Sequence, residues 1–156
     1  MIEENIVFEK EKTCCFTGHR VLKNNFNIKN LENAIESAIK KGYKTFLTGM
    51  AIGFDLKVCE TLFKYKNIEI IACIPCKNQD AFFNKKQKLQ YNNCLKKVDK
   101  VIYLNDAYVD GCMQQRNRFM VDNSSLVIAY YYSPVGGTYY TVNYAERKEK
   151  NIIFIE

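Results

Sequence analysis

The chain has 156 residues, of which 47% are hydrophobic and 26% charged, and its formal net charge is +6. This length and balance predict one soluble domain over residues 1–156 with a continuous core. No run of about 18 uncharged apolar residues occurs, so we expect no transmembrane helix and no membrane partner. The acidic start Met1–Asn5 lacks a hydrophobic secretory core, and we therefore expect a cytoplasmic protein.

The positive charge favours anionic partners, but the lysines that carry it are scattered. The densest run, Asn84–Lys88, is typical of the solvated face of a helix rather than of a DNA-binding stripe. Nucleic acid is therefore a weaker expectation than a small anionic ligand.

The chain has seven cysteines, an odd number, and most of them lie in apolar runs, as expected of small core residues in a reducing compartment. Cys73–Cys76 has the C-x-x-C spacing of redox and zinc sites. A second such pair is missing, and His19 is the only histidine, so a zinc ligand set cannot be completed. We expect neither a metal nor a cofactor.

Short β-branched or aromatic runs alternate with amphipathic stretches along the chain. The predicted strands are Thr13–Thr17, Thr45–Thr48, Ile68–Ile74, Val101–Leu104, Leu126–Tyr131 and Ile152–Ile155. The predicted helices run from about Leu31 to Gly42, from Leu56 to Phe63, from Gln79 to Val98, from Met113 to Val121 and from Thr138 to Lys148.

This alternation predicts an α/β fold, a Rossmann-like parallel sheet with helices on both faces. Right-handed crossovers then place the strand-to-helix loops along one edge of the sheet. Ligands of open α/β sheets bind at that carboxyl edge, where the strand order reverses. The loops after the first, second, fourth and fifth strands are therefore the candidate ligand loops.

Arginine is rare in this lysine-rich chain, and three of its four arginines lie beside those loops: Arg20, Arg116 and Arg118. A guanidinium can grip carboxylate or phosphate oxygens with two parallel hydrogen bonds, which an ammonium cannot do. Ordinary surface ion pairs are the alternative explanation. The glycine-rich turns nearby favour anion binding.

The segment Gly49–Asp55 joins the second strand to its helix through two glycines. Gly49 permits a tight turn, and Gly53 lets the backbone approach a ligand or another strand closely. Asp55 is either a helix cap or a ligand contact. No G-x-G-x-x-G or Walker A pattern occurs, which argues against a standard dinucleotide dehydrogenase or P-loop nucleotidase.

Two further turns carry polar residues. Gly136-Gly137-Thr138 opens the last helix, and it is either a phosphate nest, with Thr138 as helix cap or phosphate donor, or a simple turn. Thr17-Gly18-His19-Arg20 follows the first strand. His19 is either an acid or base or, more commonly for a loop histidine, a hydrogen-bonding residue.

Five segments, in this order, resemble the YpsA-like branch of the SLOG superfamily, which includes DprA/Smf DNA-processing proteins and LOG phosphoribohydrolases. The segments are Thr13–Arg20, Thr48–Asp55, Ala72–Cys76, Gly111–Asp122 and Gly136–Glu146. The resemblance extends from Thr13 to near the end of the chain. It implies that the whole chain is one SLOG domain. Because family members often form dimers or tetramers, it also implies that this chain forms a homo-oligomer.

The resemblance also implies that the carboxyl edge binds a nucleotide or a nucleotide-derived ligand. The ligand-contacting positions that it implies are Gly18, Arg20, Gly49, Gly53, Arg116, Asn117, Gly136, Gly137 and Thr138. Neighbouring residues of the same loops complete the candidate site: Thr17, His19, Met50 and Asp55.

One departure from the LOG hydrolases bears on function. Their P-G-G-x-G-T-x-x-E motif ends in a catalytic glutamate, and Thr141 stands at that position here. Glu146 lies further along the helix on another face. The leading hypothesis is therefore a binder of an adenosine- or ADP-ribose-like ligand that senses or sequesters a nucleotide signal. The alternatives are a nucleotide-processing N-glycosidic hydrolase and a DprA-like single-stranded nucleic-acid binder.

Overall fold

The computed structural model describes residues 6–156, which form six strands, five α-helices and a short 3-10 helix at Lys10–Lys12. The acidic start Met1–Asn5 lies outside the described residues. In chain order the elements are β1 (Thr13–Gly18), α1 (Ile28–Lys40), β2 (Thr45–Thr48), α2 (Phe54–Leu62), β3 (Glu69–Ile74), α3 (Lys85–Lys97), β4 (Lys100–Tyr103), α4 (Cys112–Asp122), β5 (Leu126–Tyr130), α5 (Gly136–Arg147) and β6 (Asn151–Ile155).

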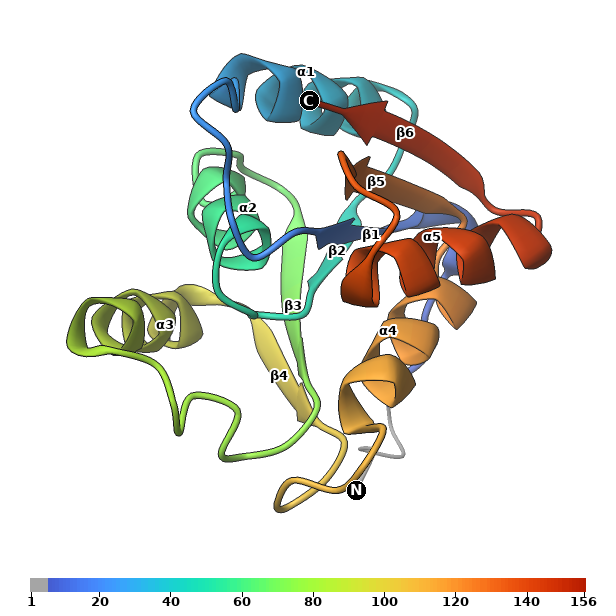
Figure 1. Ribbon diagram of the computed structural model, residues 1–156. Coiled ribbons are helices and arrows are strands. Elements are labelled where there is room, and N and C mark those ends of the chain that lie inside the picture. The colour runs from blue at the N-terminus through green and yellow to red at the C-terminus, as the bar shows by residue number, and fades with distance from the viewer. Residues whose placement is uncertain (1–5) are drawn as a thin grey trace.

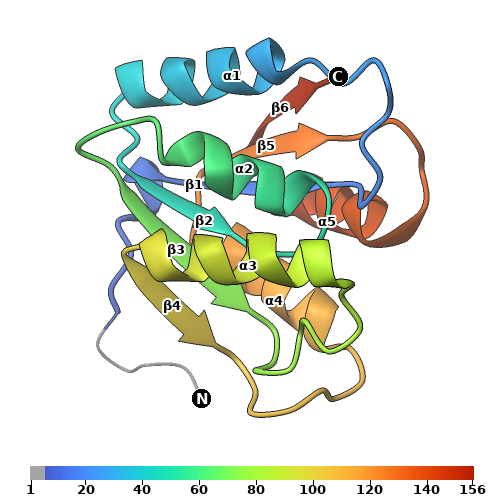
Figure 2. The ribbon, with the colours of Figure 1, turned by 90° about the vertical axis from the view of Figure 1, so that its left-hand side faces the viewer.

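All six strands are parallel and follow the order β4-β3-β2-β1-β5-β6. Helices α1, α2 and α3 cover one face of the sheet, and α4 and α5 cover the other (Figures 1 and 2). The chain moves outward from β1 to β4 and then returns to the opposite side of β1. The strand order therefore reverses between β1 and β5, and the predicted Rossmann-like fold is confirmed.

The strands are apolar on both sides because helices cover both sides. In β1, Cys14 and Phe16 pack in one cluster with Leu31 of α1 and Val58 of α2. Cys15, which lies between them, belongs to a second cluster with residues of α4 and α5. Because successive side chains of a strand point to opposite faces of the sheet, β1 contributes residues to both clusters.

One predicted helix is shorter than its sequence pattern. We expect helix from Gln79 to Val98, but α3 begins only at Lys85, and the residues before it form turns. Asn84 starts the helix through a capping box, in which its side chain accepts from the Gln87 N–H at 2.8 Å and its own N–H donates to the Gln87 side chain at 3.0 Å. The lysines of this run are exposed, as expected for a solvated face.

The cysteines are core residues, as predicted. All seven are buried free thiols, and burial raises the pKa of Cys73 to about 12. A thiol held in this protonated state is a poor nucleophile and a poor metal ligand. Within residues 6–156, no helix has the length and apolar character needed to cross a bilayer.

Candidate functional site

A pocket of about 430 Å³ lies at the carboxyl end of β1, where the strand order reverses. The loop after β1 and the first turns of α2, α4 and α5 form its walls. Ten of the predicted site residues line it: Thr17, Gly18, His19, Arg20, Asp55, Arg116, Asn117, Gly136, Gly137 and Thr138. Four segments that are distant in sequence, from Thr17 to Thr138, therefore meet in one place.

Arg116 is the central charge of the pocket, and its side chain is only 4% exposed. Its Nε donates to the Asn117 Oδ1 at 2.8 Å, while its Nη1 donates to the carbonyls of Gly49 and Cys73. Its Nη2 has only a weak contact, 3.9 Å from the Met113 sulfur. Two sides of the guanidinium are thus fixed by protein, and among the described residues the Nη2 end has no oxygen partner.

Burial lowers the pKa of Arg116, and the nearby carboxylate of Asp55 offsets this only in part. Among residues 6–156, no carboxylate lies within ion-pair distance of the guanidinium. A buried cation without a close counter-ion is unfavourable, so an anion arriving at Nη2 would relieve part of that cost.

Asp55 lies in the first turn of α2, with 7% of its surface exposed. It does not cap that helix, because Gly53 is the N-cap residue and forms no side-chain cap. Instead its Oδ2 accepts from the Ala51 N–H at 3.3 Å. Desolvation raises the pKa of Asp55 from 3.8 to about 6, against the attraction of Arg116, the Ala51 N–H and Arg20.

The end of β1 packs directly on the start of α2 because each of them has a glycine at the contact, Gly18 and Gly53. Gly53 has φ 82° and ψ −121°, and a Cβ there would overlap the main chain of Arg20. A Cβ on Gly18 would overlap the Phe54 ring. The close approach lets the Phe54 N–H donate to the His19 carbonyl at 3.2 Å, which sets the path of the loop that carries Arg20.

His19 lines the pocket beside an aromatic cluster. Its ring lies 4.2 Å from the Tyr132 ring and stacks at 6.0 Å on Tyr131. The Nε2 atom is buried and has no hydrogen-bond partner among the described residues. Burial and the charge of Lys23 lower the pKa of His19, so the ring is neutral near pH 7. A buried polar atom without a partner calls for an explanation, and a ligand would supply one.

The start of α5 faces the same pocket. Gly136 has φ 78°, which only glycine adopts readily. A Cβ added to Gly137 would lie 3.8 Å from the Asn117 Nδ2. Val135 is the N-cap residue and no side chain caps the helix, so the predicted cap by Thr138 is wrong. The first N–H groups of α5 therefore have no side-chain partner at the helix end that points into the pocket.

Three of the predicted ligand-contacting residues are not among the residues that line the pocket: Gly49, Met50 and Gly53. A Cβ on Gly49 would press on the Arg116 guanidinium and the Asp55 carboxyl. Met50 is fully buried in the core with φ 61°. The close contacts that the structure gives these three residues are with the protein itself.

The sequence pattern did not identify four residues of the lining: Phe16, Ala51, Met113 and Val135. They are apolar, and nothing in their type distinguishes them from core residues. Arg118 also differs from expectation, because its Nη1 donates to the Tyr140 hydroxyl at 2.8 Å and it lines another hollow on the far side of α4.

Among residues 6–156, no group of three His, Cys, Asp or Glu side chains is placed to hold a metal ion. The functional groups of the pocket are mainly donors: the Arg116 Nη2, the Asn117 amide and the start of α5. Asp55 is the one carboxylate among the residues that line it. The arrangement is suited to holding an anion.

Comparison with solved structures agrees with the fold. DNA processing protein A from Streptococcus pneumoniae superimposes with a TM-score of 0.71 at 18% identity, covering 94% of this chain. The chain spans 50% of that protein's length. DNA processing protein A from Helicobacter pylori, which binds single-stranded DNA, superimposes with a TM-score of 0.69 at 15% identity, covering 99% of this chain and 70% of its own.

Sequence comparison gives the family. The uncharacterized SPbeta prophage-derived protein YoqJ of Bacillus subtilis (strain 168) is 30% identical over 130 residues, which cover 72% of this chain and 76% of that protein. The model of the YpsA family, described as the YspA SLOG family, matches residues 14–156. The chain therefore belongs to the YpsA family of SLOG proteins.

Proposed function

We propose that the pocket at the end of β1 binds a phosphorylated, nucleotide-derived ligand of the adenosine or ADP-ribose type. The observation that carries this proposal is the buried guanidinium of Arg116, a residue of the pocket lining, whose Nη2 has only a thioether contact. Hydrogen bonds from a guanidinium to phosphate oxygens are charge-assisted and short, and they are about twice as strong as neutral ones.

The opposite wall supports the same chemistry. The start of α5 brings backbone N–H groups and the positive end of the helix dipole to the pocket. A phosphate between this helix end and Arg116 would be held from both sides. The Asn117 amide, fixed by its bond to the Arg116 Nε, lies near Gly137 and can donate as well.

The size of the pocket suits a small molecule. Its volume of about 430 Å³ falls within the range of roughly 300–1,000 Å³ that is usual for small-ligand sites. The buried Nε2 of His19 offers one further polar contact to such a ligand.

The proposal is for binding rather than glycosidic cleavage. Thr141, at the position of the LOG glutamate, is 1% exposed and donates to the Gly137 carbonyl at 2.8 Å. It is not among the residues that line the pocket. The pocket has one carboxylate, Asp55, and this belongs to the wall formed by α2 rather than to α5.

A second candidate function, single-stranded nucleic-acid binding, is favoured by the rim of the pocket. The exposed ring of Tyr132 lies 4.2 Å, between ring centroids, from the pocket residue His19, and the Lys23 ammonium sits 4.2 Å over the Tyr132 ring. Aromatic rings beside basic groups are the usual surface for unpaired bases. The Helicobacter pylori relative in fold binds single-stranded DNA.

The test compares two arginines of one helix. Arg116→Lys and Arg118→Lys both keep the charge, but only Arg116 lines the pocket. Calorimetric titration with AMP and ADP-ribose should show Arg116→Lys weakening binding by about 10-fold or more, as expected from loss of a charge-assisted hydrogen bond, with Arg118→Lys within about 2-fold of the parent protein.

Thermal melting provides an independent measurement. A ligand at about 100 times its Kd should stabilise the folded protein by roughly 2.7 kcal/mol. No shift with a broad nucleotide panel, together with no small molecule in native mass spectra, would reject the proposal. Binding of oligonucleotides without any binding of mononucleotides would favour the second candidate.

A further inference from the structure

A small apolar annex adjoins the site pocket. Its volume is about 180 Å³, and it shares Arg20, Ala51 and Met113 with the larger pocket. Its remaining walls are Ile52 and the turn at residues 79–83 that precedes α3. The two hollows are thus neighbours that share three residues of their walls.

Two adjacent phenylalanines of that turn differ in their packing. Phe83 is anchored, with its ring edge-on to Tyr91 at a centroid distance of 5.5 Å. Phe82 lines the annex but is 101% exposed, as exposed as in an extended chain. A phenyl ring left wholly in water gains free energy when a partner covers it. The mouth of the annex therefore carries a ring without a packing partner among the described residues.

The annex is the size of part of a ligand. Complete small-ligand sites occupy roughly 300–1,000 Å³, so a hollow of about 180 Å³ suits one ring system rather than a whole nucleotide. Its surface is mostly apolar, and Arg20, which lines both hollows, is the one charged residue of its lining. Planar rings stack on both phenyl and guanidinium faces.

The annex has few groups that could form hydrogen bonds with the edge of a base. Its only amide, Gln79, is 8% exposed, donates to the Gly49 carbonyl at 3.2 Å and accepts from the Tyr91 hydroxyl at 3.5 Å. Both ends of that amide are thus already bonded to protein. The annex therefore offers a ligand mainly apolar surface and aromatic rings, which favour stacking over specific hydrogen bonds.

We infer that the annex is the subsite for the nucleobase of the ligand, held by stacking against Phe82 and Arg20, while the phosphate lies between Arg116 and the start of α5. This inference rests on the proposed nucleotide-binding function and specifies how the base is recognised. It follows that purine nucleotides bind with similar affinity, and that a sugar phosphate without a base binds about 10-fold or more weakly.

The absence of tryptophan from the sequence makes a direct test simple. Phe82→Trp introduces a single fluorophore at the mouth of the annex. Saturation with AMP or GMP should change its emission, whereas ribose 5-phosphate at saturation should not. Leu89→Trp, at a 63% exposed position on α3 away from both pockets, is the matched control and should respond to neither.

Affinities measured by calorimetry complete the test. Phe82→Ala should lower AMP affinity about 10-fold and leave ribose 5-phosphate affinity unchanged. The base subsite is overturned if the parent protein binds ribose 5-phosphate as tightly as AMP, or if Phe82→Ala leaves AMP affinity unchanged. If the parent protein binds neither AMP, GMP nor ribose 5-phosphate, the proposed function and this inference fail together. Because Phe82 is fully exposed, the variants are expected to melt as the parent protein does.

Discussion

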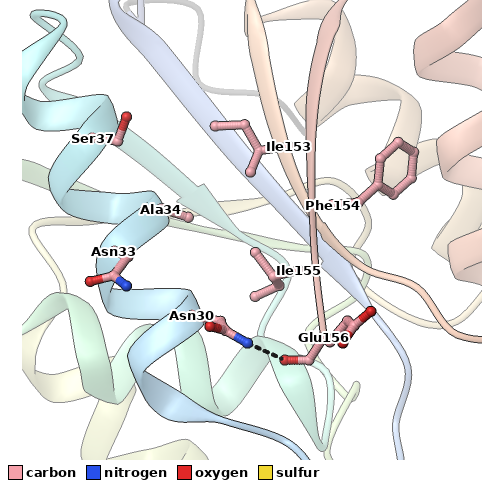
Figure 3. A pocket seen from close by; sticks show the side chains of 8 residues that line it. All are labelled: Asn30, Asn33, Ala34, Ser37, Ile153, Phe154, Ile155 and Glu156. Carbon is pink, nitrogen blue, oxygen red and sulfur yellow. Dashed lines mark hydrogen bonds between the residues drawn. The ribbon is translucent and has the colours of Figure 1, made fainter.

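The structure contains two hollows of nearly equal volume that differ in the side chains that line them. The site pocket at the end of β1 measures about 430 Å³, and the groove between α1 and β6 about 460 Å³ (Figure 3). The groove is lined by Asn30, Asn33 and Ser37 from α1 and by the last four residues of the chain. In Figure 3 the Asn30 amide reaches the Glu156 carbonyl, at 3.4 Å.

The two hollows differ in the polar and charged groups that they remove from water. The site pocket buries a guanidinium, a carboxyl and an unpartnered imidazole nitrogen. The groove has partly or fully exposed amides and one hydroxyl over apolar side chains, with no buried charge among its lining residues. Burying a charge is unfavourable unless something is gained, so these buried groups support the proposal that the site pocket, rather than the groove, binds the ligand. Volume alone does not distinguish the two.

The first prediction tests whether the site pocket depends on close backbone approach, which the groove does not need. Gly53→Ala should destabilise the protein by more than about 3 kcal/mol, because the new Cβ overlaps the Arg20 main chain in addition to the strain of φ 82°. Gly111→Ala, with φ 79° and open space around it, should cost only about 1–2 kcal/mol. Urea denaturation of both variants measures the difference. Equal losses would show that the overlap is relieved by a shift of the loop.

The second prediction concerns the buried carboxyl. The pKa of Asp55 is raised from 3.8 to about 6, so the folded state holds a proton that the unfolded chain releases. Its contribution to stability is full below about pH 3.8 and is lost as pH rises through about 6. Asp55→Asn removes this titration. It should therefore leave stability unchanged near pH 4 and raise it by roughly 2–3 kcal/mol above pH 7.

Stability measured by urea denaturation across pH 4–8 checks the sign. Parallel pH profiles of the parent protein and the variant would mean that the pKa of Asp55 is not raised, because Arg116 compensates for its burial. The site pocket would then resemble the groove more closely, with no uncompensated burial of charge at this position.

Much of the fold could be predicted from the sequence because strand and helix periods are local signals. The buried runs Thr45–Thr48 and Leu126–Tyr131 indicate strands that the structure confirms to within a residue. The start of α3 was predicted six residues too early. The pattern from Gln79 onward is helical in composition, but the capping box at Asn84 and the tertiary bond of Gln79 to Gly49 set the true start.

The candidate site was predictable where chemistry and turn signals coincide, as at Arg116 and Gly136–Thr138. It was not predictable where an apolar residue lines the pocket, as at Met113, because residue type does not separate a pocket wall from a core. The sequence also does not reveal that Gly53 packs against the Arg20 backbone. That role depends on how two distant loops pack, which no local pattern contains.

The smallest predicted effect lies in the groove. Asn33 is an exposed residue inside α1, where alanine is a better helix former by roughly 0.5 kcal/mol. Asn33→Ala should therefore stabilise the protein slightly and leave AMP affinity within about 2-fold of the parent value, as measured by thermal melting and calorimetry. A clear loss of AMP binding in this variant would contradict the comparison, since it would place the ligand between α1 and β6. An unchanged affinity, beside a large loss in Arg116→Lys, would show that buried unpaired polar groups, rather than the size of a hollow, mark the ligand site of this fold.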